Sequence, residues 1–506
     1  MNSMRVSETQ ATTKISKVLL VLPAAKHIRV TAADSSVPKR KMLRFSILGL
    51  TTVAAATPPQ YEVAICDENV QALDLDTDAE VVGISFMTAI APRAFEIARE
   101  LRRRGKIVIA GGFHPTLCPE ETAEHFDAVV TGDAEGLWPQ VLADIEAGRL
   151  GETKIYRHRD LPDLACVPAP RRDLTAHTAE YYATTHAVQT TRGCANGCTY
   201  CSITAFHRQT QRSRPVEDVL AELKTIPRDF IFVDDNIIGD VEYAKKLFAA
   251  MAPLKKRWIS QCSLRIADDP ELLRLARQAG CLAMFIGIET LSGANLSDFG
   301  KEFNDAASYR KRIAAIRKAG IGVQTGIIVG ADGDDPGVFE RMLRFLRGAR
   351  IDALQLNILT PLPGTPLFEQ FDRAGRVTDT DWSKYDFRHV VIRPAGMTAR
   401  QLQDGADWLY AQFYRLDRII LRTLRTLLSG KVTLAVLAWK LGMTYRYDNI
   451  REGIVGRNPA SRSSASQRFR AAAQRAWSEI HKGSPRLTPQ DESWNIQSSS
   501  GESCQV

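Results

Sequence analysis

Hydrophobic and polar positions alternate along this chain in two separate series. In the first series, short apolar runs are separated by helix-like segments such as 91–104 and 135–147, and the runs cover residues 18–22, 61–66, 81–86, 107–110 and 128–130. Short buried strands that alternate with helices are typical of a doubly wound parallel sheet. We therefore predict an α/β domain of this kind over residues 14–150.

A second series begins after residue 184. The predicted strands are 186–191, 230–234, 258–263, 282–288, 322–329 and 353–359, and the predicted helices are 215–225, 241–251, 269–279, 305–319 and 336–349. Pro215 in a first helical turn and Gly280 and Gly320 directly after helix ends mark the boundaries. Six strand–helix units predict a partial, TIM-like (β/α)6 barrel over residues 185–397 that is open on one side.

The rest of the chain shows neither of these alternations. Residues 151–184 are rich in proline and predict a linker, and 398–456 predict a helical C-terminal region. Residues 1–13 and 457–506 are polar, and we expect both to be mostly disordered, apart from one possible short helix at 467–481.

Within the helical region, segment 413–428 carries two stripes. One is apolar and the other contains arginines; the members are Phe413, Leu416, Ile420, Leu424 and Leu427, and Arg415, Arg418, Arg422 and Arg425. An interfacial helix that makes weak contact with an anionic lipid surface would have this pattern. A helix packed on the barrel with a solvated arginine face would have it too, and we favour this second interpretation.

Three cysteines lie within eight residues, at Cys194, Cys198 and Cys201, in the spacing Cys-x3-Cys-x2-Cys. A structural zinc site takes four ligands, and no second cysteine or histidine pair follows, although a distant His207 could complete one. A cubane iron–sulfur cluster also takes four ligands, so three cysteines leave one iron open to an exogenous molecule. Chance is the third alternative, but the other six cysteines are scattered singly.

With Tyr200 before its last cysteine, this loop resembles the radical S-adenosylmethionine (radical SAM) superfamily. The resemblance implies that Cys194, Cys198 and Cys201 bind a [4Fe-4S] cluster. It also implies that S-adenosylmethionine (SAM) chelates the fourth iron and is cleaved reductively to a 5′-deoxyadenosyl radical, and that an external one-electron donor of the flavodoxin or ferredoxin type supplies the electron.

In doubly wound sheets, ligands bind beyond the carboxyl ends of the strands. Here those ends contain Ser85 and Thr88, which could hydrogen-bond the edge of a flat ligand, and Gly111 and Gly112, which let the backbone approach it closely. With Gly-Gly-x-His-Pro and Gly-Asp-Ala-Glu, the domain resembles the cobalamin-binding class of radical SAM enzymes over about residues 15–420. The Asp-x-His-x-x-Gly motif of many cobalamin proteins is absent, and His114 is a weak candidate for a cobalt ligand.

The carboxyl ends of the barrel strands are also polar. Asp234 and Asp235 follow the second strand and could accept hydrogen bonds from the ammonium group of SAM, while Arg265 could pair with its carboxylate. Glu289, beside Gly287, could bind the ribose hydroxyls, as in similar enzymes.

Two further features of the barrel complete the predicted site. Gly326 and Gly330 offer a close approach for adenine, or only tight packing of strand on helix. The proline-rich segment 359–367 resembles the Pro-Gly-Thr-Pro signature of the class and predicts a wall of the active site.

Composition and charge limit the alternatives. The chain has 506 residues, 44% hydrophobic and 25% charged, as in a globular protein of two or three domains. Its net charge of +8 comes mostly from residues 398–506, with 16 Lys and Arg against 9 Asp and Glu, so we predict no nucleic-acid-binding surface. Without an apolar run long enough for a signal peptide or a membrane span, we expect a cytoplasmic protein.

The leading hypothesis is a cobalamin-dependent C-methyltransferase that acts on a small molecule, either a lipid or a secondary metabolite. In the mechanism that the resemblance implies, the radical removes a hydrogen atom from the substrate and methylcobalamin donates the methyl group. The alternatives are a radical SAM cyclase, rearrangement or group-transfer enzyme, a relative that has lost cobalamin, an RNA methylthiotransferase, and a non-enzymatic iron–sulfur sensor or scaffold. The sequence gives no substrate, because loops on a reused fold form the pocket walls.

Overall fold

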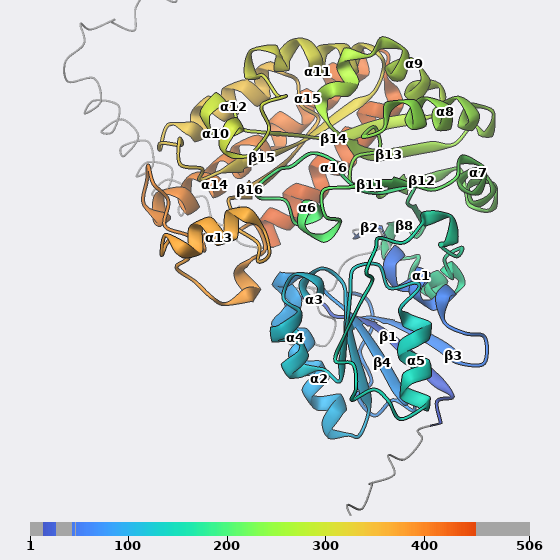
Figure 1. Cartoon of the computed structure of the whole chain (residues 1–506). Helices are drawn as coiled ribbons and strands as arrows, with labels where there is room; N and C mark the ends of the chain where they lie inside the picture. Colours follow the sequence, from blue (N-terminus) through green and yellow to red (C-terminus); the bar gives the residue numbers. More distant parts are fainter. Residues whose placement is uncertain (1–13, 27–42, 46, 452–506) are drawn as a thin grey trace, which may run out of the picture.

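The computed structural model describes residues 14–26, 43–45 and 47–451. The two ends for which we predict disorder, 1–13 and 457–506, lie outside the described residues, as does the possible helix at 467–481. Figure 1 shows two α/β bodies joined side by side, with the N-terminal sheet below and the barrel above.

The N-terminal body is a parallel sheet of six strands in the order β3-β1-β4-β5-β6-β7. The strands follow the predicted apolar runs, with one addition from the predicted linker, β7; their bounds are β1 Lys17–Leu22, β3 Glu62–Asp67, β4 Val81–Ser85, β5 Ile107–Gly111, β6 Ala128–Thr131 and β7 Ile155–Arg157. The chain moves outward in both directions from β1 and β4, so the switch point where such sheets bind ligands lies between these two strands.

Helices cover both faces of this sheet. α1 (Leu48–Ala56) and α5 (Trp138–Glu146) pack on one face, and α2 (Ala91–Arg103) packs on the other. On the first face, the indole of Trp138 donates a hydrogen bond to Thr57 Oγ1 at 2.9 Å. The predicted doubly wound α/β domain is therefore confirmed.

The barrel sheet also has six parallel strands, in the order β16-β15-β14-β13-β12-β9. Their bounds are β9 Ala187–Val188, β12 Asp229–Phe232, β13 Arg257–Cys262, β14 Cys281–Glu289, β15 Gly322–Val329 and β16 Ala353–Ile358. The helices that cover its outer face are α7 Val216–Thr225, α8 Val241–Met251, α9 Pro270–Gln278, α11 Tyr309–Lys318 and α12 Val338–Gly348. The partial (β/α)6 barrel is therefore confirmed.

The predicted first strand, 186–191, is divided in the structure. After β9 the chain leaves the barrel sheet and forms β10 (Thr191–Gly193), which pairs antiparallel with β11 (Gln211–Ser213). The predicted linker also forms β8 (Tyr182–Thr184), which pairs with β2 (Leu43–Phe45). A two-stranded ribbon therefore leads directly into the cysteine loop.

The C-terminal region forms three helices, α14 (Ala399–Phe413), α15 (Leu416–Leu428) and α16 (Val432–Arg451). The hydroxyl of Tyr414, after α14, donates to Leu354 O and accepts from Leu354 N, which fixes α14 to β16. None of the helices in the part of the chain that the structure describes combines the length and the apolarity that crossing a membrane requires.

The orientation of α15 differs from our favoured interpretation. Its apolar stripe faces outward, with Leu416, Ile420, Leu424 and Leu427 each 40–49% exposed, whereas Arg422 stacks on Phe413 with 4.2 Å between guanidinium carbon and ring centroid. The prediction of a solvated arginine face is thus wrong for Arg422. The amphipathic pattern does not determine which face turns inward, because the arginine stems can also cover apolar surface.

Candidate functional site

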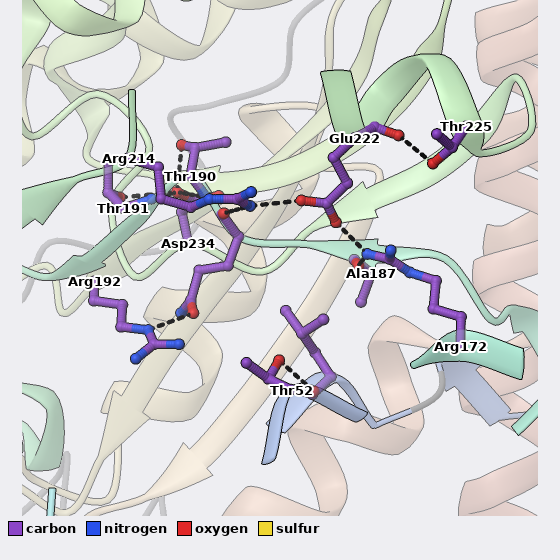
Figure 2. A network of polar contacts seen from close by, with 12 residues as sticks. Thr52, Arg172, Ala187, Thr190, Thr191, Arg192, Arg214, Glu222, Thr225 and Asp234 are labelled. Atoms are coloured by element: carbon purple, nitrogen blue, oxygen red, sulfur yellow. Dashed lines mark hydrogen bonds and ion pairs between the residues drawn. The ribbon is translucent and has the colours of Figure 1, made fainter. Parts of the chain in front are cut away.

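The cysteine loop, residues 194–201, leaves the ribbon in a direction that buried polar contacts fix. Asp234, after β12, is fully buried, and its Oδ1 accepts hydrogen bonds from the backbone and hydroxyl groups of both Thr190 and Thr191 (Figure 2). Gly193 adopts a φ of 85°, and a Cβ there would lie 2.1 Å from Thr210 O. Only glycine therefore fits at the start of the loop.

The far side of the cysteine loop is fixed by two segments that are distant in sequence. Thr199 N donates to Phe299 O at 3.2 Å, and Leu367 N donates to Thr199 O at 3.0 Å. Leu367 belongs to the proline-rich segment 359–367, and a Cβ at Gly364 of the same segment would lie 3.2 Å from Leu117 of the N-terminal body. The segment predicted as an active-site wall thus lies against both the cysteine loop and the N-terminal body.

The candidate histidine is not placed as the fourth ligand of a zinc site. His207 turns its Nδ1 toward the guanidinium of Arg212 at 3.2 Å, and its Nε2 lies 3.9 Å from Asp235 Oδ2. The three cysteines therefore leave one position open in a cluster that takes four ligands.

A buried ion pair lies beside the thiols. Glu289 Oε1 accepts from Lys301 Nζ at 2.6 Å, and both side chains are at most 12% exposed. A Cβ at Gly287 would lie 2.2 Å from Glu289 Oε1, so this glycine provides the space for the carboxylate. Burial lowers the pKa of Lys301, but Glu289 and the nearby Cys198 outweigh burial, and the net shift is upward. Sequence reasoning missed Lys301, since no motif distinguishes it from a surface lysine.

Tyr200 packs next to this pair. Its ring lies 5.1 Å from the Phe299 ring and 5.8 Å from Lys301 Nζ. Burial, reinforced by the charge of Glu289, raises the pKa of the Tyr200 phenol well above its usual value, so the phenol stays protonated. Tyr200, Glu289 and Lys301 thus form a largely buried polar cluster beside the cysteine loop, where we predict the SAM site.

The other predicted SAM contacts lie in different surroundings. Gly326 lies next to the Phe285 ring, with 2.8 Å from an added Cβ to ring Cζ, and Leu402 fills the space beside Gly330. Leu402 comes from α14, so tight packing accounts for Gly330. Arg265 is exposed, and its guanidinium lies 4.6 Å from the centroid of the Phe303 ring.

A cavity of about 310 Å³ opens at the carboxyl ends of β4, β5 and β6. Ser85, Gly111 and Gly112 line it, as predicted, together with Gly132. Thr88 is not among its lining residues, because its hydroxyl faces His114 Nδ1 at 3.4 Å. The glycine-rich wall beside the switch point suits a large planar cofactor such as a corrinoid.

His114 does not fit the role of a cobalt ligand. The side chain is fully buried, packs against Phe86 and Trp382, and places Nε2 3.3 Å from Glu121 Oε2. It is not among the residues that line the cavity. The weak sequence hypothesis for His114 is therefore wrong, because the helix that starts after Gly112 turns the imidazole into the core of the N-terminal body.

The same cavity reaches the barrel, where Phe206, His207 and Asp235 complete its lining. Phe206 comes from the short helix after the cysteine loop, α6 (Ser202–Phe206), and its ring centroid lies 4.7 Å from that of Phe113 in the N-terminal body. Asp235 Oδ2 accepts from Gly193 N at 2.8 Å. Of the two adjacent aspartates, Asp234 thus anchors the chain and Asp235 faces the cavity.

The two bodies are joined by ion pairs at this junction. Arg192 lies two residues before Cys194 and pairs with Asp133 at 2.9 Å and with Glu135, while Arg212 pairs with Asp133 at 2.8 Å. Burial alone would raise the pKa of Asp133, but Arg192 and Arg212 outweigh it and hold that pKa below its usual value. The Gly-Asp-Ala-Glu motif at 132–135 thus contacts the start of the cysteine loop.

Two titratable groups at the junction have strongly shifted pKa values in opposite directions. Burial raises the pKa of Asp235 to about 6. Burial lowers the pKa of His207 to about 4, with Arg212 acting in the same direction and Asp133 against it. At neutral pH, His207 is therefore a neutral imidazole beside an ionised Asp235.

Family models match both bodies. The Radical SAM superfamily model matches residues 188–346, which include the cysteine loop and most of the barrel, and the B12 binding domain model matches residues 45–142. The chain belongs to the radical SAM superfamily. The cofactors of this radical SAM enzyme are a [4Fe-4S] cluster and SAM, together with cobalamin.

Several curated relatives of this radical SAM enzyme are named as methyltransferases, and two more distant ones are named as anaerobic magnesium-protoporphyrin IX monomethyl ester cyclases. An uncharacterized methyltransferase of Synechocystis is 31% identical over 73% of this chain and 70% of its own length. The bacteriochlorophyllide d C-12(1)-methyltransferase of Chlorobaculum tepidum is 29% identical over 74% of this chain and 84% of its own length. The hopanoid C-2 methylase of Rhodopseudomonas palustris is 29% identical, with coverages of 66% and 65%.

A solved structure shares the fold. The cobalamin-dependent SAM radical enzyme OxsB, with aqua-cobalamin and SAM bound, superposes with a TM-score of 0.60 at 15% identity, and the match covers 93% of this chain and 85% of OxsB. The order of a cobalamin-type domain, a radical SAM barrel and C-terminal helices is thus a known architecture.

Proposed function

We propose that this radical SAM enzyme is a cobalamin-dependent C-methyltransferase that acts on an unactivated carbon of a lipid or secondary metabolite. The observation that carries the proposal is the cavity at the junction, because the glycine-rich strand ends of the B12 binding domain and the residues beside the cysteine loop line the same space. Such a cavity brings a methyl-carrying cofactor and a radical-generating one to the same substrate. The named relatives, which methylate a bacteriochlorophyllide and a hopanoid, support this substrate class.

When bound, the cluster with SAM supplies a 5′-deoxyadenosyl radical for hydrogen abstraction, and cobalamin supplies the methyl group. Cys194, Cys198 and Cys201 would hold the cluster, and Asn236 Nδ2, 3.9 Å from Cys194 Sγ, would donate to the sulfur. Glu289 would accept hydrogen bonds from the ribose hydroxyls, with Lys301 balancing its charge. Asp235 would accept from a donor on either cofactor at the junction.

The protein's main further task is to exclude water from the radical. The contact between Phe113 and Phe206 closes one side of the junction, and the proline-rich segment 359–367 closes another. These groups are apolar or rigid and keep water away from the radical. In this proposal no acid–base pair is needed, since hydrogen abstraction replaces deprotonation.

Anaerobic reconstitution tests the cluster and its reactivity. We expect about four irons and four sulfides per chain, and formation of 5′-deoxyadenosine from SAM with a strong reductant. Cys198→Ala should lose both, whereas Cys166→Ala, which removes an exposed thiol outside the loop, should keep both. Absence of 5′-deoxyadenosine from the wild-type protein with an intact cluster would reject the enzyme and favour a sensor or scaffold.

Methylation is distinguished from cyclisation or rearrangement by isotope transfer. The reconstituted enzyme with cobalamin and a strong reductant is incubated with a lipid extract and SAM whose methyl group carries three deuterium atoms. A methyltransferase gives products that retain deuterium in a new methyl group. Lipid-derived products that form only with the enzyme and contain no deuterium would instead indicate the group of alternatives without methylation.

We also propose that an external one-electron donor of the flavodoxin or ferredoxin type reduces the cluster. The expectation rests on the chemistry, because cleavage of SAM needs one electron that neither cofactor supplies on its own. Reduced flavodoxin and reduced ferredoxin should each be assayed in place of the chemical reductant. Failure of both to support formation of 5′-deoxyadenosine would contradict this part of the proposal.

Contact with a membrane surface is the second partner that we propose. The outward stripe of α15 continues into α16, where Val432, Val436 and Trp439 are 38–59% exposed and Lys440 is an exposed cation. An exposed apolar strip with a neighbouring cation is typical of a helix that rests on anionic lipid, and such a contact suits a lipid substrate.

A liposome flotation assay at low salt tests this contact. We expect the wild-type protein to float with vesicles that contain phosphatidylglycerol, and Leu424→Glu to reduce flotation. Glu340→Gln, on the outer surface of the barrel, is the control and should not change it. No flotation of the wild-type protein would end the membrane proposal, and self-association through the stripe would appear instead as a concentration-dependent mass in solution.

A further inference from the structure

A second large cavity lies on the side of the barrel that faces away from the N-terminal body. It is enclosed by α11, α12 and α15, and has a volume of about 600 Å³ (Figure 1 shows these helices at the top of the molecule). This size is typical of sites for small molecules. We call it the basic pocket; its cationic lining residues are Arg310, Arg317, Lys318, Arg347, Arg350, Arg418, Arg422, Arg425 and Lys431.

The lining of the basic pocket carries far fewer negative charges than positive ones. Asp352 is the one acidic residue among those that line it, and it already pairs with Arg317. Three helices, α11, α12 and α15, end here, and each C-terminus carries about half a negative charge, so the helix dipoles add roughly −1.5. Cations at helix C-termini are common, but the pocket is lined by nine cations, and two of them, Arg310 and Arg418, lie in the first turns of their helices. Their combined charge exceeds that of the helix dipoles severalfold.

Several of the cations have no acidic partner. Within the described part of the chain, no ion pair is formed by the five side chains Arg310, Lys318, Arg347, Arg350 and Arg425. Partial burial and the neighbouring Arg418 lower the pKa of Arg347, and burial lowers that of Arg422. The cations thus lie close enough to repel one another, which an anion between them would relieve.

The backbone at one of these residues is also unusual. Arg350 has a φ of 56°, in the left-handed region where glycine is normally preferred. It occupies the turn between α12 and β16, next to Arg347. Such a conformation is strained in a residue other than glycine, so an arginine destabilises this turn relative to a glycine. A positive charge that contributes to ligand binding in the basic pocket would account for an arginine at position 350.

Part of the remaining lining is apolar. Phe413, Leu346 and Leu421 line the same space, and Phe413 is covered by the guanidinium of Arg422. A ligand of this pocket therefore combines several negative charges with some apolar or aromatic surface. On α15, the pocket-lining Arg418, Arg422 and Arg425 occupy the helix face opposite the exposed leucine stripe, so the pocket opens away from that stripe.

We propose that the basic pocket is a binding site for a phosphorylated small molecule, with two or more phosphate groups held by arginines from α11, α12 and α15. Arginine matches phosphate because its planar fork donates two hydrogen bonds at once. The pocket lies at the amino ends of β15 and β16, whereas the cysteine loop and Glu289 lie at the carboxyl ends. It is therefore separate from the radical SAM site, and the proposal does not depend on the methyltransferase proposal.

Binding of inorganic pyrophosphate to the full-length protein, measured by isothermal titration calorimetry at low salt, tests the proposal. Arg347→Gln and Arg350→Gly each remove one charge, and glycine suits the backbone of residue 350. We expect each variant to raise the Kd about tenfold. Arg344→Gln is the matched control, because Arg344 is an exposed arginine of α12 that does not line the pocket, and its Kd should equal that of the wild type.

Vesicles distinguish the two possible sources of phosphate. If vesicle binding in the flotation assay also falls in Arg347→Gln but not in Arg344→Gln, the phosphate comes from a lipid headgroup; unchanged flotation indicates a soluble ligand. Thermal unfolding verifies that each variant is folded. The proposal is overturned if pyrophosphate does not bind the wild-type protein, or if Arg344→Gln weakens binding as much as Arg347→Gln does.

Discussion

The two ends of the barrel sheet differ in whether their positive charges have carboxylate partners. At the carboxyl ends, Arg192, Arg212 and Lys301 each have a carboxylate within hydrogen-bond distance. At the amino ends, the basic pocket gathers nine cations around Asp352. Buried, paired charges of the first kind hold a structure together. The unpaired cations of the second kind are exposed to solvent, and an anionic ligand would bind among them. The predictions below test this difference.

The largest effect is expected from Asp133→Ala, which leaves Arg192 and Arg212 buried without their shared partner. Breaking a buried pair from one side costs about 3–5 kcal/mol, and here it should also loosen the contact between the two bodies. Urea unfolding followed by tryptophan fluorescence measures the loss. Asp78→Ala removes an exposed partner of Lys17 and should leave the unfolding midpoint nearly unchanged. Equal effects of the two variants would contradict a special role for the junction.

The next effect concerns how stability depends on pH, where two opposite contributions nearly cancel in the wild type. The raised pKa of Asp235 makes stability fall as pH rises from about 4 to about 6, because the native state binds more protons than the unfolded one. The lowered pKa of His207 makes stability rise over about pH 4 to 6.5, because there the unfolded state binds more. Each contribution is roughly 3 kcal/mol, and the two nearly offset each other.

Single variants should reveal the two opposing slopes. Relative to the wild type, His207→Gln should lose stability as pH rises from 4 to 6, and Asp235→Asn should gain it over the same interval. The thermal midpoint at several pH values measures both. Parallel profiles for the wild type and both variants would show that these shifts are absent. We expect no comparable slope from Arg347→Gln, since arginine does not titrate in this range.

A smaller effect concerns the compensated pair beside the cysteines. Glu289→Gln removes the negative charge that would accept the ribose hydroxyls, and a hydrogen bond to a charged group is worth about 1.5–3 kcal/mol. We therefore expect the Kd for SAM to rise about 10- to 100-fold in the reconstituted protein under anaerobic conditions. Glu302→Gln, in the same segment but exposed, is the control. An unchanged Kd in Glu289→Gln would exclude Glu289 from the SAM site.

The smallest effect is expected at the uncompensated end. Without ligand, Arg347→Gln should change the free energy of unfolding by no more than about 0.5 kcal/mol, in the stabilising direction because one repelling charge is removed. Arg317→Gln should instead destabilise the protein, since it leaves the buried Asp352 without its ion pair. Urea unfolding at low salt compares the two. A clear loss of stability in Arg347→Gln would mean that its charge is compensated within the protein.

The amino-acid sequence determined those features that depend on short spacings and on periodicity. The cysteine loop, the twelve strands of the two large sheets apart from β7, and Gly287 beside Glu289 follow from local patterns, because a strand or a glycine-rich loop needs only neighbouring residues to be recognised. The fold class follows in turn from the order of these elements. Sequence also placed Ser85, Gly111 and Gly112 together, since the carboxyl ends of parallel strands meet at one edge of a sheet.

Only the tertiary structure decided how neighbouring or distant side chains divide their roles. Asp234 and Asp235 are equivalent in the sequence. In the structure, Asp234 accepts hydrogen bonds from Thr190 and Thr191, whereas Asp235 faces the cavity. The stripes of α15 are equally clear in the sequence, and packing alone decided that Arg422 turns inward while the apolar stripe faces outward. The basic pocket combines cations from helices that are up to about one hundred residues apart in the sequence, and a local sequence pattern does not span that separation. Charge compensation depends on separation in space, which sequence spacing does not encode.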